Sequence, residues 1–277
     1  MPEAALAAPS SVGAVLAAAV KRLRRAGCET PRLDAELLLG SALGVDRARL
    51  VMDRDKALEP DVGTRFAELV ARRADREPVA YILGRQAFRY LELTVDRRVL
   101  IPRPETELLV EVGLTLKPGA RVIDVGTGSG AVALALAQER PDLRVVGIDV
   151  SDDALAVARA NAARLGLEVE FVCGDLLAGR RADAVLANLP YVAGRDAGSL
   201  SPEIASFEPG LALFGGEDGL DLVRRLVAML DGMELVALEV GCDQADRVAS
   251  LLASAGYTSV ERMRDLAGHE RVVLARR

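Results

Sequence analysis

Two short segments in the second half of the chain carry the residues best suited to chemistry, and the first is a glycine-rich loop. Residues 124–130 read DVGTGSG and stand between a run of β-branched residues and the apolar run 131–137. Glycines let the chain turn sharply and bring a ligand close to the backbone, and free N–H groups at the start of the next helix attract polar or anionic groups. The segment therefore predicts a cofactor loop formed by Gly126, Thr127, Gly128, Ser129 and Gly130.

The spacing of these glycines indicates which cofactor the loop would hold. D-x-G-x-G-x-G is one residue shorter than the G-x-G-x-x-G loop of dinucleotide-binding proteins, and it is typical of methyltransferases that use S-adenosyl-L-methionine. That cofactor has an ammonium group and a sulfonium but no pyrophosphate. We therefore expect the carboxylate of Asp124 to attract the ammonium group, where it would repel phosphates. A glycine-rich turn without a ligand and an NAD site remain the alternatives.

Two further acidic residues are placed to bind the rest of this cofactor. Asp149 ends the next predicted strand, 23 residues beyond Gly126, where its carboxylate would accept hydrogen bonds from two ribose hydroxyls. The turn after the third strand contains Asp175 and Leu176. We expect Asp175 to accept a hydrogen bond from the adenine amine and Leu176 to pack on the ring. The alternative for Asp175 is a capping role in a tight turn.

The second segment, Asn188-Leu189-Pro190-Tyr191, follows the fourth predicted strand and suits a planar NH2 group as the methyl acceptor. The nitrogen of an amide or aromatic base is a poor nucleophile because its lone pair is delocalised. The side-chain carbonyl of Asn188, next to the cofactor, and the backbone carbonyl of Leu189 would bind both its hydrogens and orient the nitrogen. Pro190 would stiffen the loop, and Tyr191 would supply a flat wall. We therefore expect Asn188, Pro190 and Tyr191 to be catalytic and Asn188–Tyr191 to bind the substrate.

Strands and helices must alternate to bring these segments together. Runs rich in β-branched residues at 121–125, 144–149, 168–172, 182–187 and 234–240 predict strands, and amphipathic runs at 130–139, 152–165, 217–231 and 243–255 predict helices. This order predicts right-handed βαβ units and a parallel, Rossmann-like sheet of the α/β class. Two last strands, at 257–265 and 270–276, have a connection too short for a parallel crossover and predict an antiparallel edge hairpin.

The rest of the chain suggests three parts. Residues 1–85 show helical spacing throughout and predict a small all-helical domain. Residues 86–103 are β-rich around a break at Asp96–Arg98 and predict a linking β-hairpin, so that 104–277 would be the catalytic domain. The long connection 192–216 is of a length typical of lids and binding loops, with surface disorder as the alternative.

Composition excludes several classes of protein. Of 277 residues, 51% are hydrophobic and 27% charged, which excludes a disordered or membrane-embedded chain. The net charge of −6 and an aromatic content of 3% argue against stable nucleic-acid binding. Three scattered cysteines and one histidine do not suit a metal site. Residues 4–20 lack charge but precede the basic residues, unlike a signal peptide, so we expect a cytoplasmic protein without a membrane partner.

Six segments together resemble the PrmC (HemK) family of release factor glutamine methyltransferases, and the resemblance covers nearly the whole chain. They are EPVAYILG at 77–84, LIPRPETE at 100–107, the cofactor loop, Asn188–Tyr191, FEP at 207–209 and GGEDGL at 215–220. The first two are specific to the family, whereas many methyltransferases share the cofactor loop. One departure is Leu189, which stands where the family usually has proline. We expect activity to persist with a somewhat looser loop at Asn188.

The resemblance implies a seven-stranded S-adenosylmethionine-dependent methyltransferase fold behind the helical domain. It also implies methylation of the side-chain amide nitrogen of the glutamine in the GGQ motif of class I peptide chain release factors, with S-adenosyl-L-homocysteine as product. The release factor would be held by the helical domain and hairpin as well as by the pocket, whose rim would include Glu105 and Thr106. Two other functions remain open: N(6)-adenine methylation of nucleic acid, and a non-catalytic cofactor-binding module.

Overall fold

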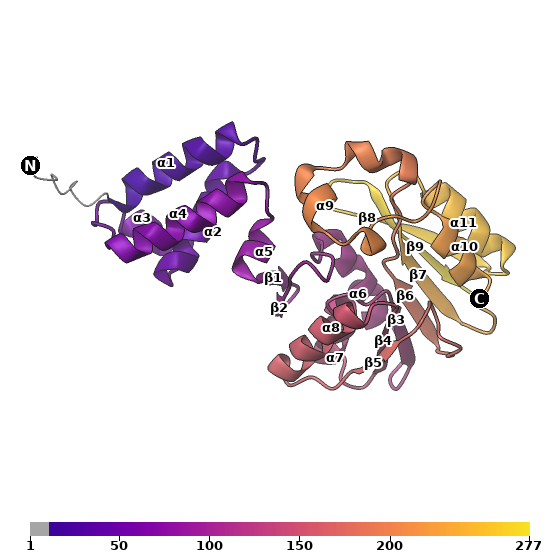
Figure 1. Ribbon diagram of the computed structural model, residues 1–277. Coiled ribbons are helices and arrows are strands. Elements are labelled where there is room, and N and C mark those ends of the chain that lie inside the picture. The colour runs from indigo at the N-terminus through magenta and orange to yellow at the C-terminus, as the bar shows by residue number, and fades with distance from the viewer. Residues whose placement is uncertain (1–10) are drawn as a thin grey trace, which may run out of the picture. The chain divides into compact units, whose positions relative to one another are not determined.

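The computed structural model describes residues 11–277 and divides at Gly84 into two compact units, each with its own elements (Figure 1). Positions 1–10 of the predicted helical domain, with part of the uncharged segment 4–20, lie outside the described residues. None of the helices within 11–277 is long and apolar enough to cross a membrane.

The first unit is helical, as the spacing of its apolar residues predicts. Its helices are α1 (Val12–Arg25), α2 (Pro31–Leu43), α3 (Arg47–Met52), α4 (Pro60–Ala74) and α5 (Val79–Leu83). Leu23, Leu38 and Phe66 are buried in a core made only of this unit's residues. Beneath the surface, Arg73 Nε donates to Asp34 Oδ2 at 2.7 Å, and both side chains are buried. Because a buried charge is costly unless it is paired, this ion pair ties α2 to α4.

The second unit begins with a β-hairpin whose turn is not where the sequence suggested. Strands β1 (Arg85–Phe88) and β2 (Leu91–Thr94) are antiparallel, and Phe88 pairs with Leu91 across the turn. The expectation that the hairpin turns at Asp96–Arg98 was therefore wrong, because the hairpin ends before those residues. Arg89 holds the turn in a left-handed conformation (φ 49°) because its backbone N–H donates to Glu107 and its guanidinium donates to Glu139. Both carboxylates are remote in sequence.

Seven strands within residues 11–277 form the main sheet in the order β5-β4-β3-β6-β7-β9-β8. They are β3 (Arg121–Val125), β4 (Arg144–Asp149), β5 (Glu170–Cys173), β6 (Ala184–Ala187), β7 (Leu235–Glu239), β8 (Ser259–Arg264) and β9 (Glu270–Arg276). The first five are mutually parallel, and β9 is antiparallel to both β7 and β8. The predicted parallel sheet with an antiparallel edge hairpin is thus confirmed.

Helices cover both faces of this sheet. Figure 1 shows α6 (Glu107–Leu114), α7 (Ala131–Glu139) and α8 (Asp152–Leu165) along one side, and α10 (Asp221–Val227) and α11 (Ala245–Ser254) along the other. A short 3-10 turn, η1 (Pro104–Thr106), precedes α6. Helix α10 is shorter than the predicted 217–231 at both ends, and before it residues 215–220 form a turn closed by a hydrogen bond from Asp221 N to Gly215 O at 3.0 Å. The core between α10, α11 and the sheet contains strand residues that face these helices. Among them are Val125, Val185, Ala187 and Leu238.

The connection after β6 is an ordered loop with short helical turns. It contains η2 (Gly194–Ser199), α9 (Pro202–Phe207) and η3 (Gly210–Ala212). Its ends are tied together, because Val192 N donates to Leu213 O at 2.9 Å and Gly215 N donates to Val192 O at 3.0 Å. The loop therefore closes on itself beside the carboxyl ends of β3 and β6, where strand order reverses and ligands bind in sheets of this type.

Candidate active site

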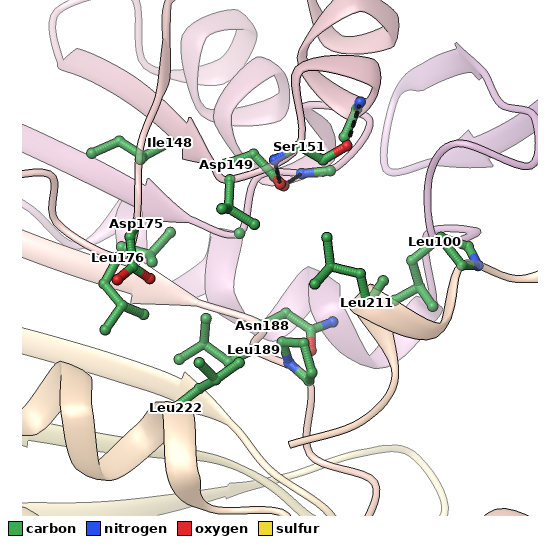
Figure 2. Close-up of a pocket in the computed structure, with 18 of the residues that line it drawn as sticks. Leu100, Ile148, Asp149, Ser151, Asp175, Leu176, Asn188, Leu189, Leu211 and Leu222 are labelled. Carbon is green, nitrogen blue, oxygen red and sulfur yellow. Dashed lines mark hydrogen bonds between the residues drawn. The ribbon is translucent and has the colours of Figure 1, made fainter. Parts of the chain in front are cut away.

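A cavity of about 290 Å³ lies at the carboxyl ends of the parallel strands, between β3, β4, β6 and the loop 192–216. This is the lower end of the range for small-molecule sites. Figure 2 shows its walls, with Asp149 on one side and Asn188 on the other. Eight residues that the sequence predicted for the site line this cavity: Gly126, Gly128, Asp149, Asp175, Leu176, Asn188, Leu189 and Pro190. Four others, Thr127, Ser129, Gly130 and Tyr191, lie behind the lining.

The glycine loop has the backbone that its sequence requires. Gly126, Gly128 and Gly130 all have positive φ, at 72°, 55° and 84°, a region that side chains disfavour. The amides of Gly126 and Thr127 both donate to Ile148 O, at 2.8 and 3.0 Å, which fixes the loop to β4. Gly130 serves a packing role, because a Cβ there would lie 3.2 Å from the Phe171 ring and 3.0 Å from Leu134.

Asp124 does not face the cavity, so the expectation that it binds an ammonium group was wrong. Its side chain is 2% exposed, and Oδ2 accepts hydrogen bonds from Thr127 Oγ1 at 2.6 Å and from Ala133 N at 3.2 Å. It therefore holds the glycine loop and the start of α7 from behind. Burial raises the pKa of Asp124 to about 6, although both hydrogen bonds favour the ionised form.

Asp149 ends β4 and joins the loop to the cavity. Its Oδ2 accepts a hydrogen bond from Gly128 N at 2.9 Å, and its Oδ1 accepts one from Ser151 N at 2.9 Å, as Figure 2 shows. A carboxylate oxygen has two lone pairs, so each oxygen can accept a further hydrogen bond from a ligand hydroxyl. The two backbone amides hold the carboxylate at the cavity wall.

Asp175 and Leu176 form the far wall of the cavity. Leu176 is buried with a left-handed backbone (φ 50°), which turns the chain so that both residues line the site. Arg225, from α10, donates to Asp175 Oδ2 in an exposed ion pair. Nothing in the sequence pattern indicated this partner, which is 50 residues away. Arg98, the other arginine in the lining, is paired with Asp96 at 2.6 Å.

Asn188 is oriented by a residue that precedes α6. Its Nδ2 donates to Thr106 Oγ1 at 3.1 Å, and Thr106 is buried. Thr106 therefore supports the site from beneath instead of lining its rim, and Glu105 is not in the lining either. Because the NH2 group of Asn188 is engaged, its carbonyl oxygen is left as the acceptor for a ligand.

The rest of the acceptor segment is anchored from below. The Leu189 side chain is 5% exposed and belongs to the core under the sheet ends, so it anchors this part of the loop. The Tyr191 backbone oxygen accepts a hydrogen bond from Gln244 Nε2 at 2.9 Å. Burial raises the pKa of the Tyr191 hydroxyl to about 12, and the nearby Glu239 adds to this shift. Tyr191 is thus a neutral, half-buried support, and Pro190 forms the wall of the cavity.

The loop 192–216 closes the remaining side of the cavity. Leu211 lies beside Leu100 in Figure 2, and both line the cavity. Glu208 joins the two segments, because its carboxylate accepts hydrogen bonds from Ile101 N at 3.3 Å and from the Arg103 guanidinium. This contact joins the FEP segment at 207–209 to the LIPRPETE segment at 100–107.

Sequence reasoning missed Asn161, a fully buried residue of α8 that supports the glycine loop. Its Nδ2 donates to Ser129 O at 3.1 Å and to Thr94 O at 3.0 Å, and its Oδ1 accepts from Thr94 N at 2.7 Å. One amide thus joins the cofactor loop to β2. Its only local signal was a polar residue on the apolar face of a helix.

The polar groups that line the cavity fit a nucleoside with a positively charged tail. Acceptors prevail on the walls, from Asp149, Asp175 and Asn188, and both lining arginines are ion-paired. Such a site suits hydroxyls, an amine and a sulfonium better than a pyrophosphate. Among residues 11–277, no group of three histidine, cysteine or acidic side chains could hold a metal ion.

Comparison with known proteins first defines the class. Residues 104–204 match the methyltransferase small domain family, and residues 14–84 match the PrmC N-terminal domain. A methyltransferase structure from Pyrococcus furiosus covers 77% of this chain and 97% of its own, with a TM-score of 0.53 and 19% identity. The hMettl16 catalytic domain, solved with the MAT2A 3'UTR hairpin 6, covers 76% of this chain and 81% of its own, with a TM-score of 0.56 and 20% identity. The fold is therefore that of the seven-stranded methyltransferases.

Curated relatives then identify the family within this class. The Rhodospirillum rubrum release factor glutamine methyltransferase is 41% identical, over 96% of this chain and 85% of the relative. Those of Koribacter versatilis and Moorella thermoacetica are 41% and 42% identical, and each alignment covers at least 94% of both chains. The chain belongs to the release factor glutamine methyltransferase family.

Proposed function

We propose that this chain transfers the methyl group of S-adenosyl-L-methionine to the side-chain amide nitrogen of the glutamine in the GGQ motif of class I peptide chain release factors, with S-adenosyl-L-homocysteine as product. The observation that carries the proposal is Asn188 at the cavity wall with its NH2 group held by Thr106. The family supports it, because its curated members bear the name of this activity.

The cofactor would lie along the carboxyl ends of β3 and β4. Gly126 and Gly128 allow it to approach the backbone, Asp149 would bind the ribose hydroxyls, and Asp175 with Leu176 would hold the adenine. When bound, S-adenosyl-L-methionine supplies an electrophilic methyl group on its sulfonium. For adenine to reach Asp175, the Arg225 side chain must share or release that carboxylate.

The glutamine amide would be held by two oxygens of the acceptor segment. The side-chain oxygen of Asn188 and the backbone oxygen of Leu189 accept its two N–H bonds, which fixes the nitrogen and stabilises the positive charge that develops on it. The methylated nitrogen is strongly acidic and loses a proton to water. No side chain is needed as a base, and Tyr191 stays protonated because its pKa is about 12.

The helical unit is our proposed contact for the release factor, together with the hairpin β1–β2. Residues 14–84 match the PrmC N-terminal domain, and α3 leaves the apolar side chains of Val51 and Met52 exposed. Apolar groups exposed together on a helix end are suited to contact another protein.

A labelling assay tests this function directly. Purified chain and cofactor with a tritiated methyl group are incubated with a release factor, with the same factor carrying GGA in place of GGQ, or with duplex DNA. We expect label in the GGQ peptide alone. Label in DNA would instead support N(6)-adenine methylation, and label in neither substrate would support a cofactor-binding module.

The variant Asn188→Ala tests the role of the acceptor segment in the same assay. We expect turnover to fall by about 10²–10³-fold, as when one preorganised polar contact to a developing charge is removed. Cofactor affinity, measured by calorimetry, should stay near that of the wild type. An equal loss of turnover and affinity would show that Asn188 only supports the fold.

A further inference from the structure

Glu239 is a buried carboxyl group behind Asn188 that the transfer reaction described above does not use. It ends β7, its side chain is 3% exposed, and its Oε2 has no hydrogen-bond partner among residues 11–277. A buried acceptor without a partner is costly. Its presence at the strand end beneath the acceptor segment therefore calls for a reason.

Thr106 links Glu239 to Asn188. The Thr106 hydroxyl lies close enough to the Glu239 carboxyl group to lower its pKa, and Thr106 Oγ1 accepts from Asn188 Nδ2 at 3.1 Å. A threonine hydroxyl has one proton. When that proton points to a carboxylate, the oxygen can only accept from its other neighbour, so Asn188 must offer its NH2 group to Thr106. The Asn188 carbonyl oxygen is then left for the cavity.

Charged groups from three other segments face Glu239. Arg103, before η1, and Arg271, on β9, favour its ionised form, whereas Glu105 of η1 opposes it. Tyr191 is also near and stays uncharged, because the negative charge of Glu239 and burial raise its pKa. Burial outweighs the two arginines and raises the pKa of Glu239 to about 7. The carboxyl group can therefore change its ionisation near neutral pH.

We propose that Glu239 is a positioning residue for methyl transfer: through Thr106, it sets the direction of the Asn188 amide so that the carbonyl oxygen faces the amine to be methylated. This inference rests on the proposed function. Only an ionised carboxylate is purely an acceptor. A glutamine at 239 can donate to Thr106, which can then donate to Asn188 Oδ1 and reverse the amide. Two NH2 groups would then face each other.

Three variants test this coupling of Glu239 to Asn188 through Thr106. We expect Glu239→Gln and Thr106→Val to lower kcat for release factor methylation by about 10–100-fold, as for other residues that orient a residue in contact with substrate. Cofactor affinity, measured by calorimetry, should change less than about two-fold because neither residue lines the cavity. Thr106→Ser keeps the hydroxyl and should restore most of the rate. Glu261→Gln, an exposed carboxylate on β8, is the matched control.

The pH dependence separates positioning from a purely structural role. Ionised Glu239 is the active form, so wild-type kcat should rise with pH through a midpoint near 7. This rise should be absent in Glu239→Gln, whose residual activity should be flat over the same range. The side-chain NH2 resonance of Asn188, assigned by its loss in Asn188→Ala, should shift with the same midpoint in cofactor-free wild-type protein.

The outcomes distinguish this inference from the proposed function. If the wild type does not label the GGQ peptide, the proposed function fails. If the wild type is active and folded Glu239→Gln matches its kcat and pH profile, only the positioning role is overturned. If Glu239→Gln does not fold, the Asn188 resonance in the wild type decides, and a resonance that does not change between pH 5 and 9 would overturn the inference.

Discussion

Leu189 stands where the PrmC family usually has a proline, and its burial anchors the loop in place of a ring. Its Cδ2 lies 3.6 Å from the position that a Cβ on Gly126 would take, so the same side chain packs beneath the cofactor loop. A proline at 189 would restrict the backbone of Asn188 instead. The two residues are thus alternative ways to fix one asparagine.

Substitutions at 189 test this equivalence. We expect Leu189→Pro to keep turnover within about three-fold of the wild type, since one restraint replaces the other. Leu189→Ala has neither restraint and should lower the free energy of unfolding by about 2–3 kcal/mol, with a loss of turnover. Urea unfolding and the labelling assay measure both, with the fully exposed Leu266→Ala as control. Abolished transfer in Leu189→Pro would contradict this account.

The raised pKa of Asp124 should make the stability of the protein depend on pH. Its pKa is raised by burial from 3.8 to about 6, so its favourable contribution is present below pH 4 and is lost as pH rises through 6. The Asp124→Asn variant can still accept from Thr127 and Ala133 but does not ionise. We expect it to gain about 2–2.5 kcal/mol of stability relative to the wild type between pH 4 and pH 7.5.

Urea unfolding of both proteins across this range measures the difference. The comparison cancels the titration of other buried groups, such as Glu239, because both proteins contain them. A difference in stability that does not vary with pH would show that Asp124 has an ordinary pKa in the folded protein.

The sequence could predict which residues have suitable chemistry but not always where they point. Asp149, Asp175 and Asn188 line the cavity because they end or closely follow strands at the edge where parallel strands meet their ligands. Asp124 lies one residue before the end of β3 and therefore faces α7. Asn161 and Glu239 were missed because their partners, such as Ser129 and Thr106, are remote in sequence and only the folded chain brings them together.

At the scale of elements, the turn at 215–219 is built against the acceptor segment. A Cβ on Gly215 would lie 2.3 Å from Pro190 O, and one on Gly219 would lie 2.1 Å from Tyr191 O and 2.6 Å from Gln244 Nε2. No real Cβ fits at such distances. The GGEDGL motif therefore reflects the close approach of two backbones, with Gly219 also in a left-handed conformation (φ 77°).

A matched pair of alanine substitutions separates these two causes. Gly256 has φ 90° and nothing within 4 Å of its Cβ position, so Gly256→Ala should cost only the left-handed backbone, about 1–2 kcal/mol. We expect Gly219→Ala to cost about 3 kcal/mol or more because Tyr191 and Gln244 must also move, and to lower turnover. Equal losses of stability would show that the contact with Tyr191 has no energetic weight.

Strand positions were predictable at this scale, whereas the hairpin turn was not. Runs of β-branched residues fix β3 and β4 locally, and the structure has them at the predicted bounds. The turn at Arg89 instead depends on carboxylates from α6 and α7. Local preference favoured Asp96–Arg98, where Asp96 does accept from Arg98 N at 3.0 Å and form a turn, but one outside the hairpin.

For the whole molecule, the two units have separate cores, so their stabilities should be separable. The helical core contains residues from 12 to 82, and the core described beneath α10 and α11 contains residues from 123 to 275. A chain of this kind does not unfold as one two-state system. Calorimetry should therefore resolve two transitions.

The buried pair of Asp34 and Arg73 assigns those transitions. Asp34→Ala leaves Arg73 buried without this carboxylate and should destabilise the helical unit by about 3–5 kcal/mol. The transition that S-adenosyl-L-methionine raises should not move. The control is Asp61→Ala, which removes an exposed ion pair with Arg65 at 3.7 Å and should cost less than about 1 kcal/mol. A joint shift of both transitions would show that the units unfold together.

The hydrogen bonds that join the two ends of the loop 192–216 have a consequence for sequence changes within the loop. The hydrogen bonds between Val192, Leu213 and Gly215 hold the two ends independently of what lies between them. Residues 195–206, which precede the segment that lines the cavity, can thus change without moving those two ends. A change of length within residues 195–206 should therefore leave Leu211 at the cavity wall and Glu208 on its partners Ile101 and Arg103.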